Sequence, residues 1–194
     1  MFPFRKKLEN RTDEELMQLI CDADEQAFTT LYMRYSQKML RFIYRLLRSD
    51  EEKAQDMLQD LFMKIVEHPE RYDQSLKFSP WIYKVAGNMC FNEIRNTKNR
   101  LRLVETEFTA DELIQKHENI FTGIDAKNFS IEYNRHFNKL EEEQQLLLTL
   151  RFQQELQIKE IAEIMNIAEG TVKSRIFYLL KKFSVLLHEF NPAK

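Results

Sequence analysis

The chain contains 194 residues, of which 43% are hydrophobic and 31% charged, with only 3 Gly and 4 Pro. This composition is too apolar for a disordered chain, and the shortage of turn-forming residues argues against a β sandwich or barrel. No stretch of about 18 apolar residues could cross a membrane, and the N-terminus lacks the apolar core of a signal peptide. We therefore expect a cytoplasmic protein without membrane insertion.

The side-chain patterns that support common enzyme chemistry are absent from the sequence. Cys21 and Cys90 have no CxxC spacing and the histidines lie far apart, so we expect free thiols and no metal site. No GxxxxGK[ST], GxGxxG or GxSxG motif occurs. These absences predict a protein that is not an enzyme and that needs no cofactor.

Charge is distributed unevenly along the chain, although the net charge is −2. Residues 33–103 carry 14 Lys/Arg and 9 Asp/Glu, residues 104–143 carry 4 and 10, and residues 144–194 carry 7 and 5. This basic, acidic, basic order indicates two binding lobes and a different connector. The pI near 6.1 argues against tight DNA binding by the isolated chain, because phosphate neutralisation supplies most non-specific affinity.

Helical periodicity dominates the first half of the chain. Asp13 is a plausible N-cap for a short helix, Ser49-Asp50 ends one helix and caps the next, and Ser79-Pro80 is typical of a helix start. His68-Pro69 stops the third helix and leaves a loop over residues 69–79. The helices are predicted over residues 13–20, 27–47, 50–67 and 80–97.

Periodicity weakens over residues 98–134, which we interpret as an acidic linker, and it resumes near residue 135. One helix is expected to end near Gln154, followed by helices over 157–165 and 169–188. The predicted fold is therefore all-α. It has two small helical domains, residues 1–97 and 135–194, joined by the linker.

The sharpest local signal is QIKEIAEIMNIAEGTVKSRIFYLLKKF, residues 157–183, which fits a helix-turn-helix. Ala162 permits close approach of the two helices, Asn166 tolerates the positive φ of the turn, and Val172 packs back onto the first helix. An inward stripe is predicted for Val172, Ile176, Leu179, Leu180 and Phe183. Groups suited to phosphates and base edges share the outer side: Thr171, Lys173, Ser174, Arg175, Tyr178, Lys181 and Lys182. The alternative is a helical hairpin with a solvated basic face.

Two predicted helix faces in the first half of the chain are candidates for binding surfaces. Asp56, Gln59 and Asp60 form a polar, acidic patch, which is either a solvated face or a docking patch for a protein partner. The helix after the loop carries amides and bases without acids on one face, with aromatic rings around its start. Such a set suits single-stranded bases, although core packing is the alternative for Phe78 and Trp81.

Four segments appear in order: DADEQAFTTLYMRY, AQDMLQDLFMKI, FSPWIYKVAGNMCFNEIRN and IKEIAEIMNIAEGTVKSRI. Together they resemble the bacterial sigma factors of the sigma-70 family, in the extracytoplasmic-function (ECF) group, over residues 22–98 and 135–187. The resemblance implies a transcription initiation factor that binds core RNA polymerase and directs it to promoters through their minus-10 and minus-35 elements. It also implies an anti-sigma factor as a partner.

The resemblance also assigns residues to these partners. Polymerase docking on the β′ clamp helices falls to Asp56, Gln59, Asp60 and Phe62. Melting and capture of single-stranded minus-10 DNA falls to the 69–79 loop and to Tyr72, Phe78, Trp81, Lys84, Asn88, Asn92 and Arg95. Reading of duplex minus-35 DNA, beside the polymerase β flap, falls to Glu169, Thr171, Lys173, Ser174, Arg175, Tyr178 and Lys182. Two rival interpretations are a stand-alone helix-turn-helix regulator and a helical adaptor without DNA binding.

Overall fold

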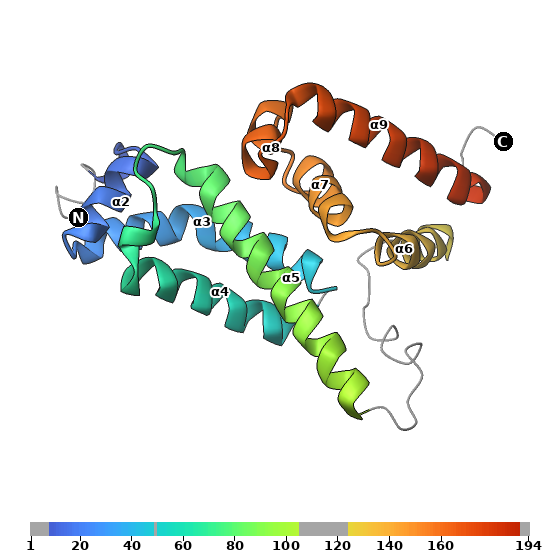
Figure 1. Ribbon diagram of the computed structural model, residues 1–194, viewed down its shortest axis with the longest axis horizontal. Coiled ribbons are helices and arrows are strands. Elements are labelled where there is room, and N and C mark those ends of the chain that lie inside the picture. The colour runs from blue at the N-terminus through green and yellow to red at the C-terminus, as the bar shows by residue number, and fades with distance from the viewer. Residues whose placement is uncertain (1–7, 49, 105–123, 191–194) are drawn as a thin grey trace.

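The computed structural model describes residues 8–48, 50–104 and 124–190, and within these ranges the regular structure is entirely helical. The N-terminal lobe contains α2 (Asp13–Cys21), α3 (Glu25–Leu46), α4 (Glu51–Glu67), the short 3-10 helix η1 (Pro69–Arg71) and α5 (Phe78–Val104). The C-terminal lobe contains α6 (Ile124–Phe137), α7 (Glu142–Phe152), α8 (Ile158–Met165), α9 (Glu169–Leu186) and the 3-10 helix η3 (His188–Phe190). Long α5 crosses in front of α3 in this view and lies against the C-terminal lobe, which α3 also contacts (Figure 1).

The first helices begin where short polar side chains can satisfy their free backbone N–H groups. Thr12, rather than the predicted Asp13, caps α2: its hydroxyl accepts from Glu15 N, and the Glu15 carboxylate accepts from Thr12 N at 2.9 Å. Asp24 accepts two backbone hydrogen bonds at the start of α3. Asp50 accepts one in the first turn of α4, as the sequence predicts.

Helix α5 begins at Phe78, two residues before the predicted start at Pro80. The carboxylate of Glu14, on α2, accepts a hydrogen bond from Phe78 N at 3.1 Å and so caps α5 from outside. Burial raises the pKa of Glu14, but this hydrogen bond and other local interactions outweigh it and hold that pKa below its ordinary value. Pro80 lies within the first turn, where its missing N–H costs nothing.

The C-terminal lobe contains the predicted helix-turn-helix. Asn166 adopts the left-handed conformation with φ 53°, and its N–H closes the end of α8. Val172, Ile176, Leu179 and Phe183 are buried, which confirms most of the predicted stripe of α9. The prediction for Leu180 was wrong, because a residue directly after Leu179 is rotated about 100° off that stripe and stays exposed.

The segment before the helix-turn-helix differs from its prediction. Instead of one helix from residue 135 to Gln154, α6 ends at Phe137 and α7 begins at Glu142. The Gln145 side chain donates to Leu140 O at 2.9 Å and holds the turn between them. Both α5 and α6 extend into the predicted linker, and its central residues 105–123 lie outside the described residues.

The two lobes pack directly against each other, and α5 lies against α7 and α8. Leu146 of α7 packs against α5 at Gly87, and it would lie 3.5 Å from a Cβ at that position, an ordinary van der Waals contact. Tyr83 Oη donates to Gln154 Oε1 at 3.2 Å across the same junction. Burial, with a smaller contribution from the charge of Glu160, raises the pKa of Tyr83 to about 12.

A second contact joins the lobes farther along α3. The guanidinium carbon of Arg45 lies 5.3 Å from the ring centre of Tyr133 and 4.7 Å from that of Phe137, both on α6. A cation held over aromatic faces gains more when it is partly shielded from water, as Arg45 is. The junction therefore includes apolar packing, a hydroxyl–amide hydrogen bond and a cation–π contact.

Candidate polymerase and nucleic-acid interfaces

The predicted docking patch lies on the outer face of α4. Asp56, Gln59 and Asp60 are exposed, and Met63 continues the same row with 53% of its side chain accessible. Phe62, predicted to contact polymerase, is instead 3% exposed, with its ring 4.7 Å from that of Tyr32. The assignment of Phe62 to the surface was wrong, since position 62 lies on the buried side of α4. Met63 was missed, although its spacing of seven from Asp56 marks the exposed face.

An acid-free row runs along the exposed side of α5. Lys84, Asn88, Asn92 and Arg95 are all exposed, at spacings that put them on one face. Arg95 Nη2 donates to Asn92 Oδ1 at 2.9 Å, so the two side chains present a joined donor surface. Arg95 Nε also lies 3.5 Å from the Glu142 carboxylate of α7. The structure places these four of the six predicted α5 residues on one exposed face.

The aromatic residues predicted to stack on bases behave differently. Tyr72 is 4% exposed and Phe78 fully buried, and Trp81 is half-buried against both. Their ring centres lie 5.2 to 5.7 Å apart, the distances of packed aromatic pairs. In this conformation Tyr72 and Phe78 offer no face to a base, which corrects their assignment as contacts. Burial of each apolar ring lowers the free energy of the folded chain, and the buried rings hold the adjacent loop in place.

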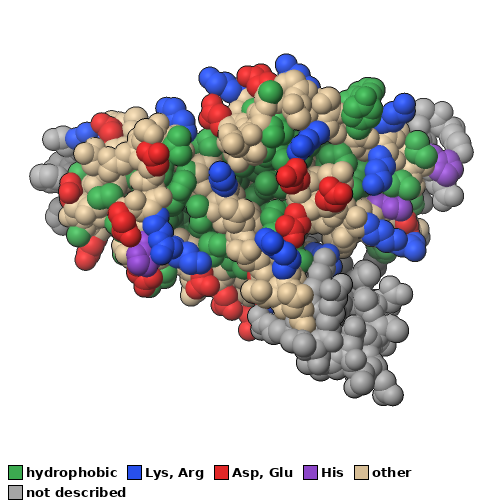
Figure 2. Space-filling view, viewed as in Figure 1, with side chains coloured by type: hydrophobic (Ala, Val, Ile, Leu, Met, Phe, Trp, Pro, Cys, Tyr) green, Lys and Arg blue, Asp and Glu red, His purple; other side chains and the backbone are tan. Residues whose placement is uncertain are grey.

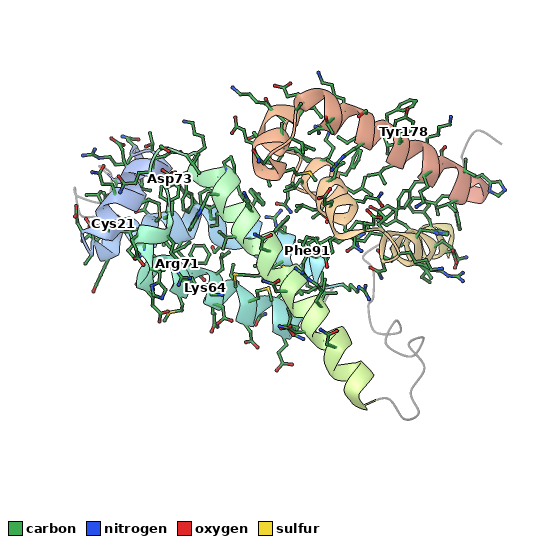
Figure 3. The ribbon with its side chains drawn as sticks, viewed as in Figure 1. Cys21, Lys64, Arg71, Asp73, Phe91 and Tyr178 are labelled. Carbon is green, nitrogen blue, oxygen red and sulfur yellow. The ribbon has the colours of Figure 1, made fainter. Side chains whose placement is uncertain are left out.

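The loop that this cluster anchors is exposed between η1 and α5 (Figure 3). Tyr72 Oη donates to Leu76 O, and burial raises the pKa of Tyr72 to about 12, so the phenol stays a neutral donor. Asp73 Oδ1 accepts from Ser75 N at 2.9 Å and from Ser75 Oγ at 2.7 Å, which folds the loop into a tight turn. Arg71, Asp73 and the 53%-exposed Leu76 are among its accessible groups, and the sequence located the loop without singling them out.

The outer side of α9 presents the predicted duplex-reading residues. Arg175 is half-buried, and its Nη1 lies 2.8 Å from the Glu143 carboxylate of α7. Tyr178 projects from the outer side of the helix and is 67% exposed, beside the equally accessible Phe177 that the sequence analysis did not assign (Figure 3). Thr171 is half-buried, and the remaining predicted residues are exposed: Glu169, Lys173, Ser174 and Lys182.

The described residues hold no group of three or more His, Cys, Asp or Glu side chains arranged for a metal ion. Among the described helices, none combines the length and apolar character needed to span a bilayer. The described residues thus present an acidic face on α4, an acid-free face of amides and bases on α5, and a helix-turn-helix on the other lobe.

Comparison with known proteins identifies the family. The sigma-70 region 2 profile matches residues 31–100, which span α3 to α5, and the sigma-70 region 4 profile matches residues 134–183, which include the helix-turn-helix. The chain belongs to the sigma-70 family, in its ECF group, and is a transcription initiation factor that directs RNA polymerase to promoters.

Several curated relatives match over most of their length. ECF RNA polymerase sigma factor SigW of Bacillus subtilis is 29% identical over 79% of this chain and 84% of its own. RNA polymerase sigma-H factor of Pseudomonas aeruginosa is 27% identical over 88% and 91%. ECF RNA polymerase sigma-E factor of Escherichia coli K12 is 28% identical over 87% and 91%.

Two solved structures share the fold. The sigma factor RpoE from Bartonella quintana, crystallised with the anti-sigma factor NepR, superposes with a TM-score of 0.62 at 20% identity, covering 83% of this chain and 96% of its own. CnrH, solved with the cytosolic domain of CnrY, superposes with a TM-score of 0.66 at 17% identity, covering 92% and 99%. The two-lobed helical architecture is therefore shared with chains of low sequence identity.

Proposed function

We propose a division of labour within this sigma factor: α4 docks on core polymerase, α5 and its preceding loop open and hold the minus-10 element, and α9 reads the minus-35 element. The observation that carries the proposal is the presence of two DNA-suited helix faces, on α5 and α9 of different lobes, and of an acidic face on a third helix, α4. A stand-alone regulator or an adaptor would need no such third face.

Docking is assigned to Asp56, Gln59, Asp60 and Met63. Two carboxylates one turn apart complement a basic surface, and the exposed methionine supplies an adaptable apolar anchor between them and the partner. The expected target is the clamp helices of the β′ subunit. Phe62 contributes from behind, by filling the core under this face.

Opening is assigned to the exposed groups of the 72–77 loop together with Lys84, Asn88 and Asn92. Unpairing and flipping a base costs a few kcal/mol, which contacts made only by the flipped strand must offset. Amide side chains can donate to and accept from base edges, and Lys84 can meet the backbone phosphates. Tyr72, Phe78 and Trp81 position the loop rather than touch the bases in the packed state.

Duplex reading is assigned to the first turns of α9. The N-terminal part of the second helix enters the major groove in this motif, so Glu169, Lys173 and Arg175 reach furthest in. Arg175 is suited to a bidentate contact with guanine, and Lys182 two turns later is suited to phosphate. The polymerase β flap is the expected support for this lobe.

The cellular setting is proposed on the same basis. Because its partners are polymerase and promoter DNA, the protein works in the cytoplasm and without catalysis of its own. One similar solved structure contains an anti-sigma factor, and the other contains the cytosolic domain of a second protein, CnrY, which supports an anti-sigma factor for this chain as well.

Run-off transcription with purified core polymerase and fragmented genomic DNA tests the proposal. Discrete transcripts that require this protein, with start sites that share two upstream sequence blocks, are the expected result. Transcription unchanged from core polymerase alone, or tight operator binding in the absence of polymerase, would contradict it.

A further inference from the structure

Helix α2 contacts the loop that precedes α5 at two points. In the first turn of α2, Glu14 Oε1 accepts a hydrogen bond at 3.1 Å from the backbone N–H of Phe78, where the loop ends. At the last residue of α2, Cys21 Sγ lies 4.0 Å from Nε2 of Gln74, which belongs to the loop. Helix α2 thus supports a segment that follows these contact residues by 53 to 64 positions in the sequence.

The start of α5 needs this acceptor from outside. The side chain of Lys77, directly before the helix, carries only donors and cannot cap it. Pro80 has no N–H, and Trp81 N donates to Lys77 O at 3.4 Å. The N–H of Phe78 is therefore one of the few at this helix start that still require a partner. Glu14 provides an acceptor whose negative charge also suits the helix dipole.

Glu14 is itself held in place by the packing of α2 on α3. The neighbouring Asp13 accepts hydrogen bonds from Arg34 Nη1 at 2.6 Å and from Tyr35 Oη. The ring centre of Tyr35 lies 5.1 Å from that of Phe78. Helix α2 therefore contacts the backbone of Phe78 and α3 contacts its side chain, so both fix the same residue against the N-terminal lobe.

A displacement of Phe78 would move the exposed loop. Its ring centre lies 5.6 Å from that of Tyr72, and the Tyr72 hydroxyl donates to Leu76 O. The loop therefore starts and ends on one buried cluster, and its exposed residues Leu76 and Lys77 directly precede Phe78. The exposed row of α5 begins at Lys84, six residues or about 9 Å along the same helix.

The charge of α2 indicates that it supports the loop without touching DNA. Residues 13–21 contain three acids and no Lys or Arg. Figure 2 shows acidic side chains among those exposed at the end of the molecule where α2 lies. Carboxylates repel the phosphates of a nucleic-acid strand. A contribution of α2 to promoter recognition must therefore act through the loop.

We propose that Glu14 is a positioning residue for recognition of the minus-10 element: its hydrogen bond to Phe78 N holds the loop in the conformation that receives the unpaired strand. This inference rests on the proposed function of the loop and of α5. It gives a role in promoter selection to α2, which lies before residues 31–100, the segment that matches the sigma-70 region 2 profile.

Selection of DNA by the holoenzyme tests the proposal. The probe is a library of duplexes that carry a short unpaired bubble of random sequence, so no promoter has to be known beforehand. Glu14→Ala removes the acceptor, whereas Glu14→Gln keeps one in its amide oxygen. Asp50→Ala is the matched control, because Asp50 also accepts one backbone hydrogen bond at 3.1 Å at a helix start of the same lobe. All variants are compared at equal occupancy of core polymerase.

Glu14→Ala should lower the preference for the selected bases roughly fivefold, the equilibrium effect of one lost cap. Glu14→Gln and Asp50→Ala should remain close to the wild type. An unchanged preference in Glu14→Ala, or an equal loss in Asp50→Ala, would overturn the role of Glu14 while leaving the proposed function intact. If the wild-type holoenzyme selects no bubble sequence, the proposed minus-10 function fails, and the role of Glu14 fails with it.

The fluorescence of Trp81 provides a second readout, in the free chain. Trp81 is the single tryptophan of the sequence and is half-buried against Tyr72 and Phe78. Glu14→Ala should increase the quenching of Trp81 by acrylamide, whereas Glu14→Gln and Asp50→Ala should not. Circular dichroism checks that each variant keeps its helices. Equal quenching in Glu14→Ala and the wild type would contradict the positioning of the loop by Glu14, whatever the holoenzyme selects.

Discussion

Helices α5 and α9 both present basic and polar faces, yet they are supported in opposite ways. Helix α5 starts from a buried cluster of Tyr72, Phe78 and Trp81 that anchors a loop beside it. Helix α9 packs through one buried stripe that ends at Phe183, and it leaves two further aromatic rings, those of Phe177 and Tyr178, in solvent. In the proposed function, α5 must hold an unpaired strand, which requires rigidly positioned side chains beside it. Helix α9 must only enter the major groove, which is wide enough for a single helix.

The largest effect that we expect is loss of the proposed binding of α4 to core polymerase. Without it, neither the proposed minus-10 function of α5 nor the proposed minus-35 function of α9 can operate. Asp56→Lys with Asp60→Lys replaces attraction by repulsion at the docking face, so co-purification with core polymerase should be abolished while helicity by circular dichroism is retained. Asp22→Lys with Glu25→Lys, at exposed positions of the same lobe, is the charge-matched control. If the α4 variant still binds core polymerase, the acidic patch is an ordinary solvated face.

Because the rings at the start of α5 are buried and two rings of α9 are exposed, removing a ring should lower the free energy of unfolding by different amounts in the two helices. Phe78→Ala empties a fully buried site that touches Tyr35, Tyr72 and Trp81, so unfolding by urea should show a loss of about 3–5 kcal/mol. Tyr178→Ala removes an exposed ring and should change stability by less than about 0.5 kcal/mol. Comparable losses of unfolding free energy in the two variants would contradict the difference in aromatic support between α5 and α9.

Two residues of α9 should separate base contacts from phosphate contacts. Arg175→Ala should cost about 1–3 kcal/mol and relax preference at one minus-35 position. Lys182→Ala should weaken all sequences similarly and lower the salt slope by about one unit. Promoter-library binding by holoenzyme at several salt concentrations measures both. If neither variant changes any positional preference, α9 reads DNA shape and backbone instead.

The α5 face should show its defect in opening rather than in attachment. Asn88→Ala is expected to lower transcription from a duplex promoter about tenfold, or about 1.4 kcal/mol, and to recover on a pre-melted bubble template. Ser184→Ala, at an exposed position of the other lobe, serves as the control. An equal defect on both templates would argue against a role of Asn88 in melting.

The smallest effect concerns the cap that joins α2 to α5. The folded-state pKa of Glu14 lies below its ordinary value of 4.5, so its stabilisation is present above pH 4.5 and is lost as the pH falls through the lower folded value. Below pH 4.5 the wild type should therefore lose stability more steeply than Glu14→Gln. Thermal unfolding across this range measures the difference, and parallel curves for the two proteins would contradict a role for the carboxylate.

Much of the fold and part of the site could be predicted because they depend on neighbours in sequence. Asp50 caps its own helix, Asn166 turns its own chain, and the stripe from Val172 to Phe183 follows one helical period. The exposed rows on α4, α5 and α9 follow from the same periodicity. Leu180 and Phe62 show its limit, since an apolar residue beside a stripe is ambiguous until the packing partner is known.

The sequence by itself thus determined the helical class, the helix-turn-helix and the faces that carry charge. Only the tertiary structure decided that Glu14 caps a helix 64 residues away, that Tyr72 and Phe78 anchor the loop from inside, and that the lobes close together. It also decided that Glu143 pairs with Arg175 across 32 residues. The physical reason is that periodicity reports which side of a helix is apolar, whereas the identity of a distant partner depends on how whole helices pack.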